Sequence, residues 1–213
     1  KGYFLTKSKL YRSAQEAAFY GGQLDRWVPS PVAMRSAKQR LGNDYFFYER
    51  PGFYNTNFSF NMTPARNIAW RTDVRIREAI WRLTDKQALM QRGYEGAGEV
   101  PNGLLPTTLT PYQPTAAETE QYTKNDVAAA RQLLSAAGWD ENKTVGLMTR
   151  GNGDILESVA LVQQANLARG GFKTNVEAQP GGAEFFARLT ENSWDMMIEP
   201  PPGTDTPGQQ LRT

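Results

Sequence analysis

Apolar side chains return at helical spacing between residues 72 and 90, which is the clearest pattern in the chain. One face of the predicted helix is apolar apart from a single glutamine: Ile76, Ile80, Leu83, Gln87 and Met90. Thr72 and Asp73 precede this helix as candidate N-caps. The run from Thr84 to Gln87, Thr-Asp-Lys-Gln, has the form of a capping box, so a second helix is predicted to start there, with Thr84 as its N-cap.

Apolar runs and helical patterns alternate through the last third of the chain. The predicted order is strand, helix, strand, helix, strand: Val145–Thr149, Ile155–Arg169, Phe172–Ala178, Ala183–Glu191 and Trp194–Ile198. Strands joined by helices through short connections require right-handed crossovers, which make neighbouring strands parallel. The sequence therefore predicts an α/β fold with a mixed, largely parallel sheet flanked by helices.

The remaining segments carry weaker patterns. Helices are predicted at Ser8–Tyr20 and Ala33–Leu41, a strand with alternating aromatic residues at Tyr54–Phe60, and a helix that Asn125 caps and Gly138 ends. The segment Thr107–Thr123 lacks any period and is predicted to be a surface connection without regular structure.

Composition limits the classes of function open to the chain. The 213 residues include 24 basic and 22 acidic side chains, and the net charge of +2 is not concentrated in a long basic run, which argues against binding nucleic acid. The chain has neither Cys nor His, so thiolate chemistry and the commonest general base are both absent. No window reaches the length of a membrane span. This length allows one large or two small domains, and we expect residues 1–213 to form a single domain.

Several motifs point to a known family. The helix beginning at Asp73 reads D-x-R-x-R-x-A-I, the next reads T-D-K-x-x-L-M, and a G-x-G loop ending in Leu-Pro follows. Phe58–Asn61 lies upstream, and Asn125–Trp139, with its L-L-x-x-A-G-W ending, lies downstream. Together these segments resemble the family 5 extracellular solute-binding proteins of peptide, nickel and oligosaccharide ABC importers, and the resemblance covers almost the whole chain.

The resemblance implies an architecture and a role. The chain would be the second, C-terminal lobe of a two-lobed protein with the type II periplasmic-binding-protein fold. It would capture a small solute, peptide-like or other, against the first lobe and present it to the membrane subunits of an importer. The expected location is periplasmic or extracellular, as a lipoprotein in full length. A monomer without cofactor, metal or catalytic activity is expected.

Arg150 and Asp205 are the charged candidates for ligand binding. Arg150 directly follows a predicted strand, at the sheet edge where open α/β sheets bind ligands. In dipeptide-binding relatives a similar Arg-containing turn binds the ligand carboxylate, and Asp205 matches part of a motif that holds the peptide ammonium. The prolines after Glu199 depart from that motif, which puts an ordinary peptide ligand in doubt. The alternatives are a surface ion pair between Arg150 and Asp154, and a turn capped by Asp205.

Two aromatic residues, Tyr54 and Trp27, are further candidates for ligand contact. Aromatic side chains stack on ligands, but they more often fill a core. Asp154 and Glu157 are spaced as an acid–base pair on one helix face, although acidic residues are also favoured in a first helical turn by the helix dipole. No calcium-loop or phosphate-loop spacing is present, and no His is available to activate a serine.

Two alternatives to transport remain open. The same fold serves as a ligand-sensing domain attached to helix-turn-helix regions in transcription regulators, and a carboxylate-based hydrolase is the third hypothesis. A signal peptide with a lipid-attachment Cys at the start of the full gene would favour transport, and a helix-turn-helix would favour regulation. Measurable turnover in a hydrolase screen would favour the third.

Overall fold

The computed structural model describes residues 12–49, 55–66, 68–103, 105–151 and 155–199. Its contacts divide the chain into two compact units, residues 1–49 and residues 50–213, which we describe separately. The expectation of a single domain stays a prediction. Within the described ranges, no helix is long and apolar enough to cross a lipid bilayer.

The first unit contains two helices, α1 (Arg12–Tyr20) and α2 (Pro31–Leu41). After α1 the chain turns through Gly22, whose φ of 70° is readily adopted only by glycine. The Ser30 hydroxyl accepts a hydrogen bond from the Ala33 amide at 3.2 Å and so caps α2. A short 3-10 turn, Gly42–Asp44, follows α2. Both helices were predicted from the sequence.

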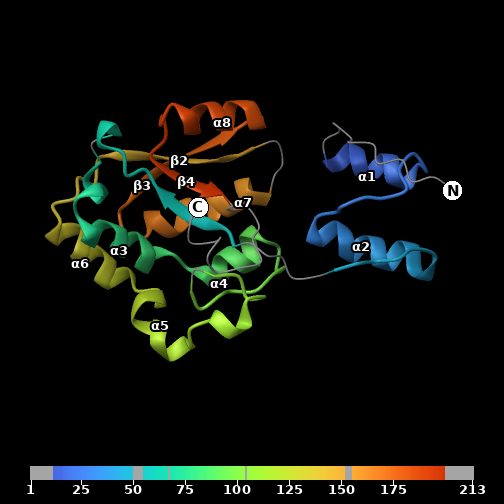
Figure 1. The fold of residues 1–213 in the computed structure, drawn as a ribbon, viewed down its shortest axis with the longest axis horizontal. Coiled ribbons are helices and arrows are strands. Elements are labelled where there is room, and N and C mark those ends of the chain that lie inside the picture. The colour runs from blue at the N-terminus through green and yellow to red at the C-terminus, as the bar shows by residue number, and fades with distance from the viewer. Residues whose placement is uncertain (1–11, 50–54, 67, 104, 152–154, 200–213) are drawn as a thin grey trace. The chain divides into compact units, whose positions relative to one another are not determined.

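The second unit is built on a four-stranded sheet (Figure 1). Its strands are β1 (Asn57–Phe60), β2 (Thr144–Arg150), β3 (Lys173–Gln179) and β4 (Met196–Glu199). The spatial order is β1-β4-β2-β3, in which β2 pairs parallel with both β3 and β4 while β1 runs antiparallel to β4. The predicted mixed, largely parallel sheet is confirmed.

Helices cover both faces of this sheet. The crossover helices are α7 (Ile155–Ala168) between β2 and β3, and α8 (Gly182–Thr190) between β3 and β4. The other helical segments are α3 (Val74–Leu83), α4 (Lys86–Ala88), a π-helical turn (Leu89–Gly93), α5 (Ala116–Thr123), α6 (Val127–Ala136) and 3-10 turns at Pro64–Arg66, Ala69–Arg71 and Thr110–Tyr112. In Figure 1, α8 lies on one side of the sheet and α3, α6 and α7 lie on the other.

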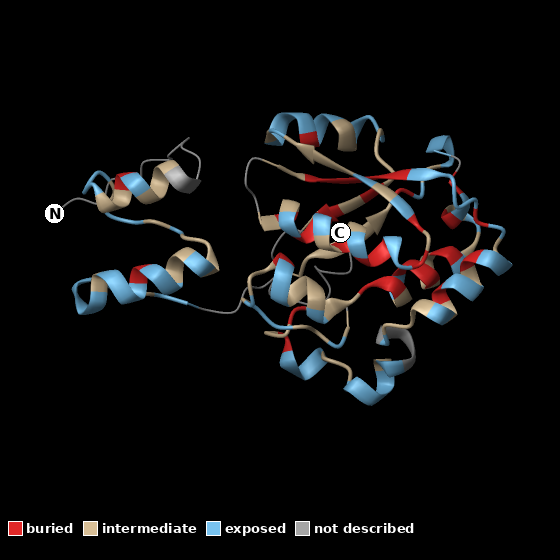
Figure 2. Cartoon of the chain, turned by 180° about the vertical axis from the view of Figure 1, so that it is seen from behind, coloured by how far each residue is buried: buried red, intermediate tan, exposed pale blue. Residues whose placement is uncertain are grey.

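The main core fills the space between the sheet and α3, α6 and α7, where Figure 2 shows most of the buried residues of this unit. Ile76, Ile80 and Leu83 of α3 are at most 2% exposed, so the predicted apolar stripe is the buried face of this helix. Trp139 stacks on Trp70 and Phe172, with ring centroids 6.4 and 4.5 Å away. These rings join the ends of three segments that are distant in the sequence, and their burial stabilises the fold.

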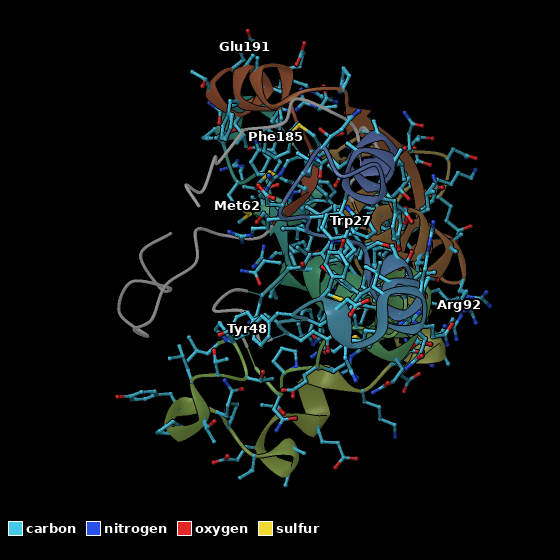
Figure 3. All side chains as sticks on the ribbon, turned by 90° about the vertical axis from the view of Figure 1, so that its right-hand side faces the viewer. Trp27, Tyr48, Met62, Arg92, Phe185 and Glu191 are labelled. Atoms are coloured by element: carbon cyan, nitrogen blue, oxygen red, sulfur yellow. The ribbon has the colours of Figure 1, made fainter. Side chains whose placement is uncertain are left out.

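The opposite face of the sheet has a smaller apolar centre beneath α8. Met148 of β2 and Phe185 of α8 are buried there, 0% and 1% exposed. Figure 3 shows Phe185 on the side of α8 nearer the strands and Glu191 on its outer side. Beyond this centre the face carries polar strand residues, and these form the candidate site described below.

Two predicted helix caps are wrong by one residue. The N-cap of α4 is Asp85, whose carboxylate accepts from the Ala88 amide at 2.9 Å. Thr84 instead ends α3: its hydroxyl donates to the Ile80 carbonyl at 2.9 Å and accepts from Gln163 at 2.8 Å. Thr84 is only 6% exposed, so its hydroxyl satisfies buried groups rather than a helix terminus.

The N-cap of α6 is likewise Asp126, which accepts from the Ala129 amide at 2.9 Å. The side-chain amide of Asn125, the predicted cap, donates to the Arg82 carbonyl at the end of α3 at 2.8 Å. The sequence also failed to predict α5, which begins with a capping box formed by Thr115 and Glu118. The prediction of an irregular segment up to Thr123 is therefore wrong for its second half.

Candidate functional site

Each of the four strands contributes one polar residue to the sheet edge where the parallel strands end. Across the sheet these residues are Asn57, Glu199, Arg150 and Gln179, which we call the edge row. Asn57 is in register with Glu199, and Arg150 is in register with Gln179. The pairing of Met148 with Met197 continues two residues further to place Arg150 opposite Glu199. Ligands of open α/β sheets bind outside this edge.

Strand alternation determines the face from which the edge row projects. Val145 and Leu147 of β2 are buried in the main core, so Met148 and Arg150 point to the opposite face. The registered partners of Arg150 share its face, because residues in register on neighbouring strands point to the same side. The edge row therefore continues the face that carries α8, and all four of its residues are partly exposed.

Arg150 and Glu199 form a side-on ion pair at the centre of the row. The guanidinium Nε donates to Glu199 Oε2 at 2.9 Å, and Nη2 donates to the other carboxylate oxygen. The Arg150 side chain is 41% exposed and that of Glu199 is 19% exposed. The pair is thus open to solvent at one side, and it is not an internal ion pair of the core. Asp154, the partner in the alternative reading of Arg150 as a surface ion pair, lies outside the described residues.

Gly151 fixes how the chain leaves the row. Its amide donates to the Gln179 carbonyl at 2.8 Å, which extends the pairing of β2 and β3 by one residue. A Cβ at this position would lie 3.0 Å from that same oxygen and 3.2 Å from the Ala178 Cβ. Only glycine fits without a shift of the neighbouring strand, so this position holds the end of β2 close to β3.

On the core side of the same sheet edge, two side-chain hydroxyls form a hydrogen bond. Thr56 directly precedes β1, and its hydroxyl hydrogen-bonds the Tyr94 hydroxyl. Tyr94 follows the π-helical turn and packs against the main core. That turn approaches α7 closely, because a Cβ on Gly93 would lie 3.0 Å from Val159 Cγ2. The long glycine-marked loop after α4 is thus anchored beside the edge row.

Of the four residues predicted to bind the ligand, the structure describes two, and only one of these lies in the edge row. Arg150 lies at the predicted edge, whereas Tyr54 and Asp205 lie outside the described residues. Trp27 lies in the first unit, where its ring packs against Phe19 and Tyr20 with centroids 5.6 and 5.9 Å away. This aromatic packing gives Trp27 a structural role, and ligand contact by Trp27 stays a prediction.

Sequence reasoning missed three members of the edge row: Asn57, Gln179 and Glu199. Each is a terminal residue of its strand, and the predicted boundaries excluded both Gln179 and Glu199. The available signal was the position of polar residues directly after apolar strand runs. That signal becomes specific only when the strand order is known, because the order decides which strand ends become neighbours.

The groups with shifted pKa values lie elsewhere and are explained by local structure. The Arg75 side chain, which hydrogen-bonds Asp73, lowers the pKa of that N-cap carboxyl. Hydrogen bonds from the Thr115 amide and hydroxyl lower the pKa of Glu118. Burial lowers the pKa of Lys86, whose ammonium lies 4.8 Å from the centre of the Trp81 ring. Both carboxyls belong to helix caps, so these shifts do not identify a catalytic acid or base.

The described residues contain no group of three or more His, Cys, Asp or Glu side chains placed to hold a metal ion. An open depression of about 430 Å³ lies among α3, α5 and α6, lined by Arg82, Ala117, Glu120, Lys124 and Asp126. Its lining mixes both signs of charge and includes no strand end. The edge row is therefore the stronger candidate for a ligand site.

Comparison with known proteins gives one family. The model described as "Bacterial extracellular solute-binding proteins, family 5 Middle" matches residues 11–210. No curated protein matches the chain significantly.

Similar solved structures include AgaA of A. tumefaciens R10 in complex with agropinic acid, with a TM-score of 0.76 and 20% identity over 94% of this chain. AppA of Bacillus subtilis in complex with a nonapeptide gives 0.70 and 16% over 90% of this chain. NikZ of Campylobacter jejuni in complex with Ni(L-His) gives 0.70 and 17% over 92%. This chain spans 39% of each of these proteins. The similarities confirm the predicted type II periplasmic-binding-protein fold.

Proposed function

Because the chain belongs to the bacterial extracellular solute-binding proteins of family 5, we propose that it is the second lobe of a receptor that captures a small solute for an ABC importer. The edge row is the binding surface of this lobe. The first lobe, supplied by the rest of a longer protein, covers the solute from the other side. Closure of the two lobes then signals occupancy to the membrane subunits of the importer.

The observation that carries the proposal is the placement of a guanidinium–carboxylate pair, flanked by two amides, at the carboxyl ends of the parallel strands. Such a row can bind the charged and hydrogen-bonding groups of a polar solute. The row is partly exposed and lies on the sheet face away from the main core. A polar site on the ends of sheet strands is largely preformed, which helps to orient a ligand.

These features favour a binding protein that does not catalyse a reaction. The family consists of substrate-binding proteins, and the two carboxyls with shifted pKa values are explained as helix caps. We therefore propose that the protein is not an enzyme and needs no cofactor. The matched family and the structures named above are those of solute-binding proteins, which favours transport over the ligand-sensing domain of a regulator.

The family description places its members outside the cytoplasm. We propose a periplasmic or extracellular location for this protein, with a lipid anchor in full length and a monomeric state. The similar structures named above are complexes with a nonapeptide, with Ni(L-His) and with agropinic acid. A small polar solute of this range is the proposed ligand.

The test begins with the full-length protein, purified and analysed by mass spectrometry for a bound solute. Titration calorimetry with the identified solute then compares the wild type with Arg150→Ala and with Arg92→Ala, an exposed arginine outside the row. Loss of a charged hydrogen bond should weaken binding by about 1.5–3 kcal/mol in Arg150→Ala and leave Arg92→Ala unchanged. Equal affinities of all three proteins for the solute would contradict binding at the edge row.

A further inference from the structure

We propose that Glu199 sets the specificity of the edge row by acting as a built-in counter-ion for Arg150, so that solutes whose only charge is negative are excluded. This inference rests on the proposed function, because it requires that the solute binds at the edge row. The accepted solutes carry a positive group close to a carboxylate.

The geometry of the pair shows the competition. Glu199 occupies the Nε and Nη2 donors of Arg150, which form the side-on fork that best matches a carboxylate. An incoming carboxylate must displace Glu199 from this fork, or bind the end-on edge formed by Nη1 and the second hydrogen of Nη2. A guanidinium already neutralised in this way attracts a lone anion weakly, because the Glu199 charge opposes it at close range.

Burial makes the displacement unfavourable unless Glu199 gains a new partner. The Glu199 side chain is 19% exposed and that of Arg150 is 41% exposed, so Glu199 is the more buried partner of the pair. Within the described part of the chain, the hydrogen bonds of the Glu199 carboxylate all go to Arg150. A solute with an ammonium or guanidinium group near its carboxylate compensates both charges, whereas a lone anion leaves Glu199 partly buried and unpaired.

Two other ion pairs that involve residues of the sheet or next to it differ from this one. The Asp195 carboxylate, paired with Arg66, also accepts from the Gly146 amide at 3.0 Å. Arg188, paired with Glu177, also donates from Nε to the Ser193 carbonyl at 3.0 Å. Both pairs therefore hold the backbone in place. The Arg150–Glu199 pair can exchange partners without breaking a backbone contact of the Glu199 carboxylate, which suits a ligand site.

The residues on either side of the Arg150–Glu199 pair are uncharged, so the edge row has no net charge. Asn57 and Gln179 add amides on either side of the pair, and each amide provides both donors and acceptors without charge. The row has one positive and one negative charge. It is complementary to a solute with the reverse arrangement of charges and polar groups around them.

The experiment measures occupancy of Arg150 directly in the full-length protein. Phenylglyoxal modifies accessible arginines, and mass spectrometry of the Arg150 peptide gives its rate relative to exposed Arg92, which corrects for consumed reagent. The probes are glycylglycine and N-acetylglycine, which share the glycine carboxylate and amide and differ by the ammonium group. The proteins are the wild type, Glu199→Gln, and the control Glu78→Gln, which makes the same change at the Arg82 ion pair.

Wild type and Glu78→Gln should be half-protected by glycylglycine at a concentration about tenfold lower than by N-acetylglycine. In Glu199→Gln the two probes should protect equally, and unprotected Arg150 should react faster than in the wild type. Equal protection by both probes in the wild type would overturn the proposal, and so would an unchanged preference in Glu199→Gln. If neither probe protected Arg150 in any of the three proteins, the proposal would also be overturned. A co-purified solute would still support the proposed function in that case.

Discussion

At the residue scale, alternation along β2 decides the chemistry of the strand end. Leu147 and Thr149 point into the core side, where they are fully buried, whereas Met148 and Arg150 point to the other face. The sequence predicted the position of Arg150 after a strand because apolar runs are easy to recognise. Its partner was not predictable, since Glu199 is distant in sequence and becomes a neighbour only through the pairing of β4 with β2.

Thr84 illustrates the same dependence on tertiary contacts. Its hydroxyl joins the Ile80 carbonyl to the Gln163 side chain, and Gln163 in turn accepts from Asn166 at 3.2 Å. Gln163 is completely buried, so its amide depends on these partners. The capping-box pattern predicted that Thr84 caps the next helix. Its hydroxyl instead hydrogen-bonds the Ile80 carbonyl and Gln163 of α7.

Replacing Thr84 by valine should therefore destabilise the protein by about 1–3 kcal/mol, because the Gln163 amide would remain buried without its acceptor. Urea unfolding of the variant measures this change. The exposed Thr72 hydroxyl, which reaches the Ala69 carbonyl at 3.3 Å, offers a matched control. Thr72→Val should change the free energy of unfolding by less than about 0.5 kcal/mol. Equal effects of the two substitutions would show that the buried network contributes little.

At the element scale, segments with an apolar period were predicted well, and the start of α4 was predicted from the cap pattern at Thr84. All four strands and the helices α1, α2, α3, α6, α7 and α8 match predicted elements, with boundaries that differ by a few residues. The helix α5 was not predicted from the sequence because it lacks an apolar face: Ala116 and Ala117 are exposed. Its only local signal was the Thr-x-x-Glu pattern at Thr115, which the Thr- and Pro-rich composition of the segment obscured.

Cap positions could not be chosen from sequence where two suitable residues are adjacent. Asn125 and Asp126 both suit an N-cap, and the position of the Arg82 carbonyl decides between them. The same applies to Thr84 and Asp85. Local propensity therefore placed the starts of α4 and α6 within one residue. Contacts with α3 and α7 determined which of the two adjacent residues became the N-cap.

The capping box of α5 predicts a pH dependence. Glu118 Oε2 accepts from the Thr115 amide at 2.7 Å and from its hydroxyl at 2.8 Å, which lowers the pKa of Glu118 from its ordinary value of 4.5. A lowered folded-state pKa stabilises the cap fully above pH 4.5, and this contribution is lost as the pH falls through the folded value.

Amide hydrogen exchange of the first turn of α5 measures this effect. Protection of the Glu118 amide, corrected for the intrinsic rate, should decrease between pH 6 and pH 3 more in the wild type than in Glu118→Gln, whose side chain does not titrate. Glu120→Gln, an exposed change in the same helix, should follow the wild type. Parallel pH profiles for wild type and Glu118→Gln would exclude the carboxylate as the titrating group.

At the scale of the whole molecule, the proposed binding surface is the polar edge row of one sheet. The second unit has its own core, and the edge row lies on the sheet face opposite to the main core. The chain spans 39% of AppA and of AgaA, and the proposed function assigns the covering surface to the remainder of a longer protein. Enclosure by two surfaces is what makes binding tight, because burial of most of the ligand excludes water.

A crystal structure of the full-length protein with its co-purified solute tests directly whether the solute binds at the edge row. Solute atoms should lie within hydrogen-bonding distance, about 2.7–3.2 Å, of the Arg150 guanidinium, with Glu199 facing a positive group of the solute. A solute bound elsewhere in this lobe, with the Arg150–Glu199 pair intact and in contact only with water, would contradict binding at the edge row.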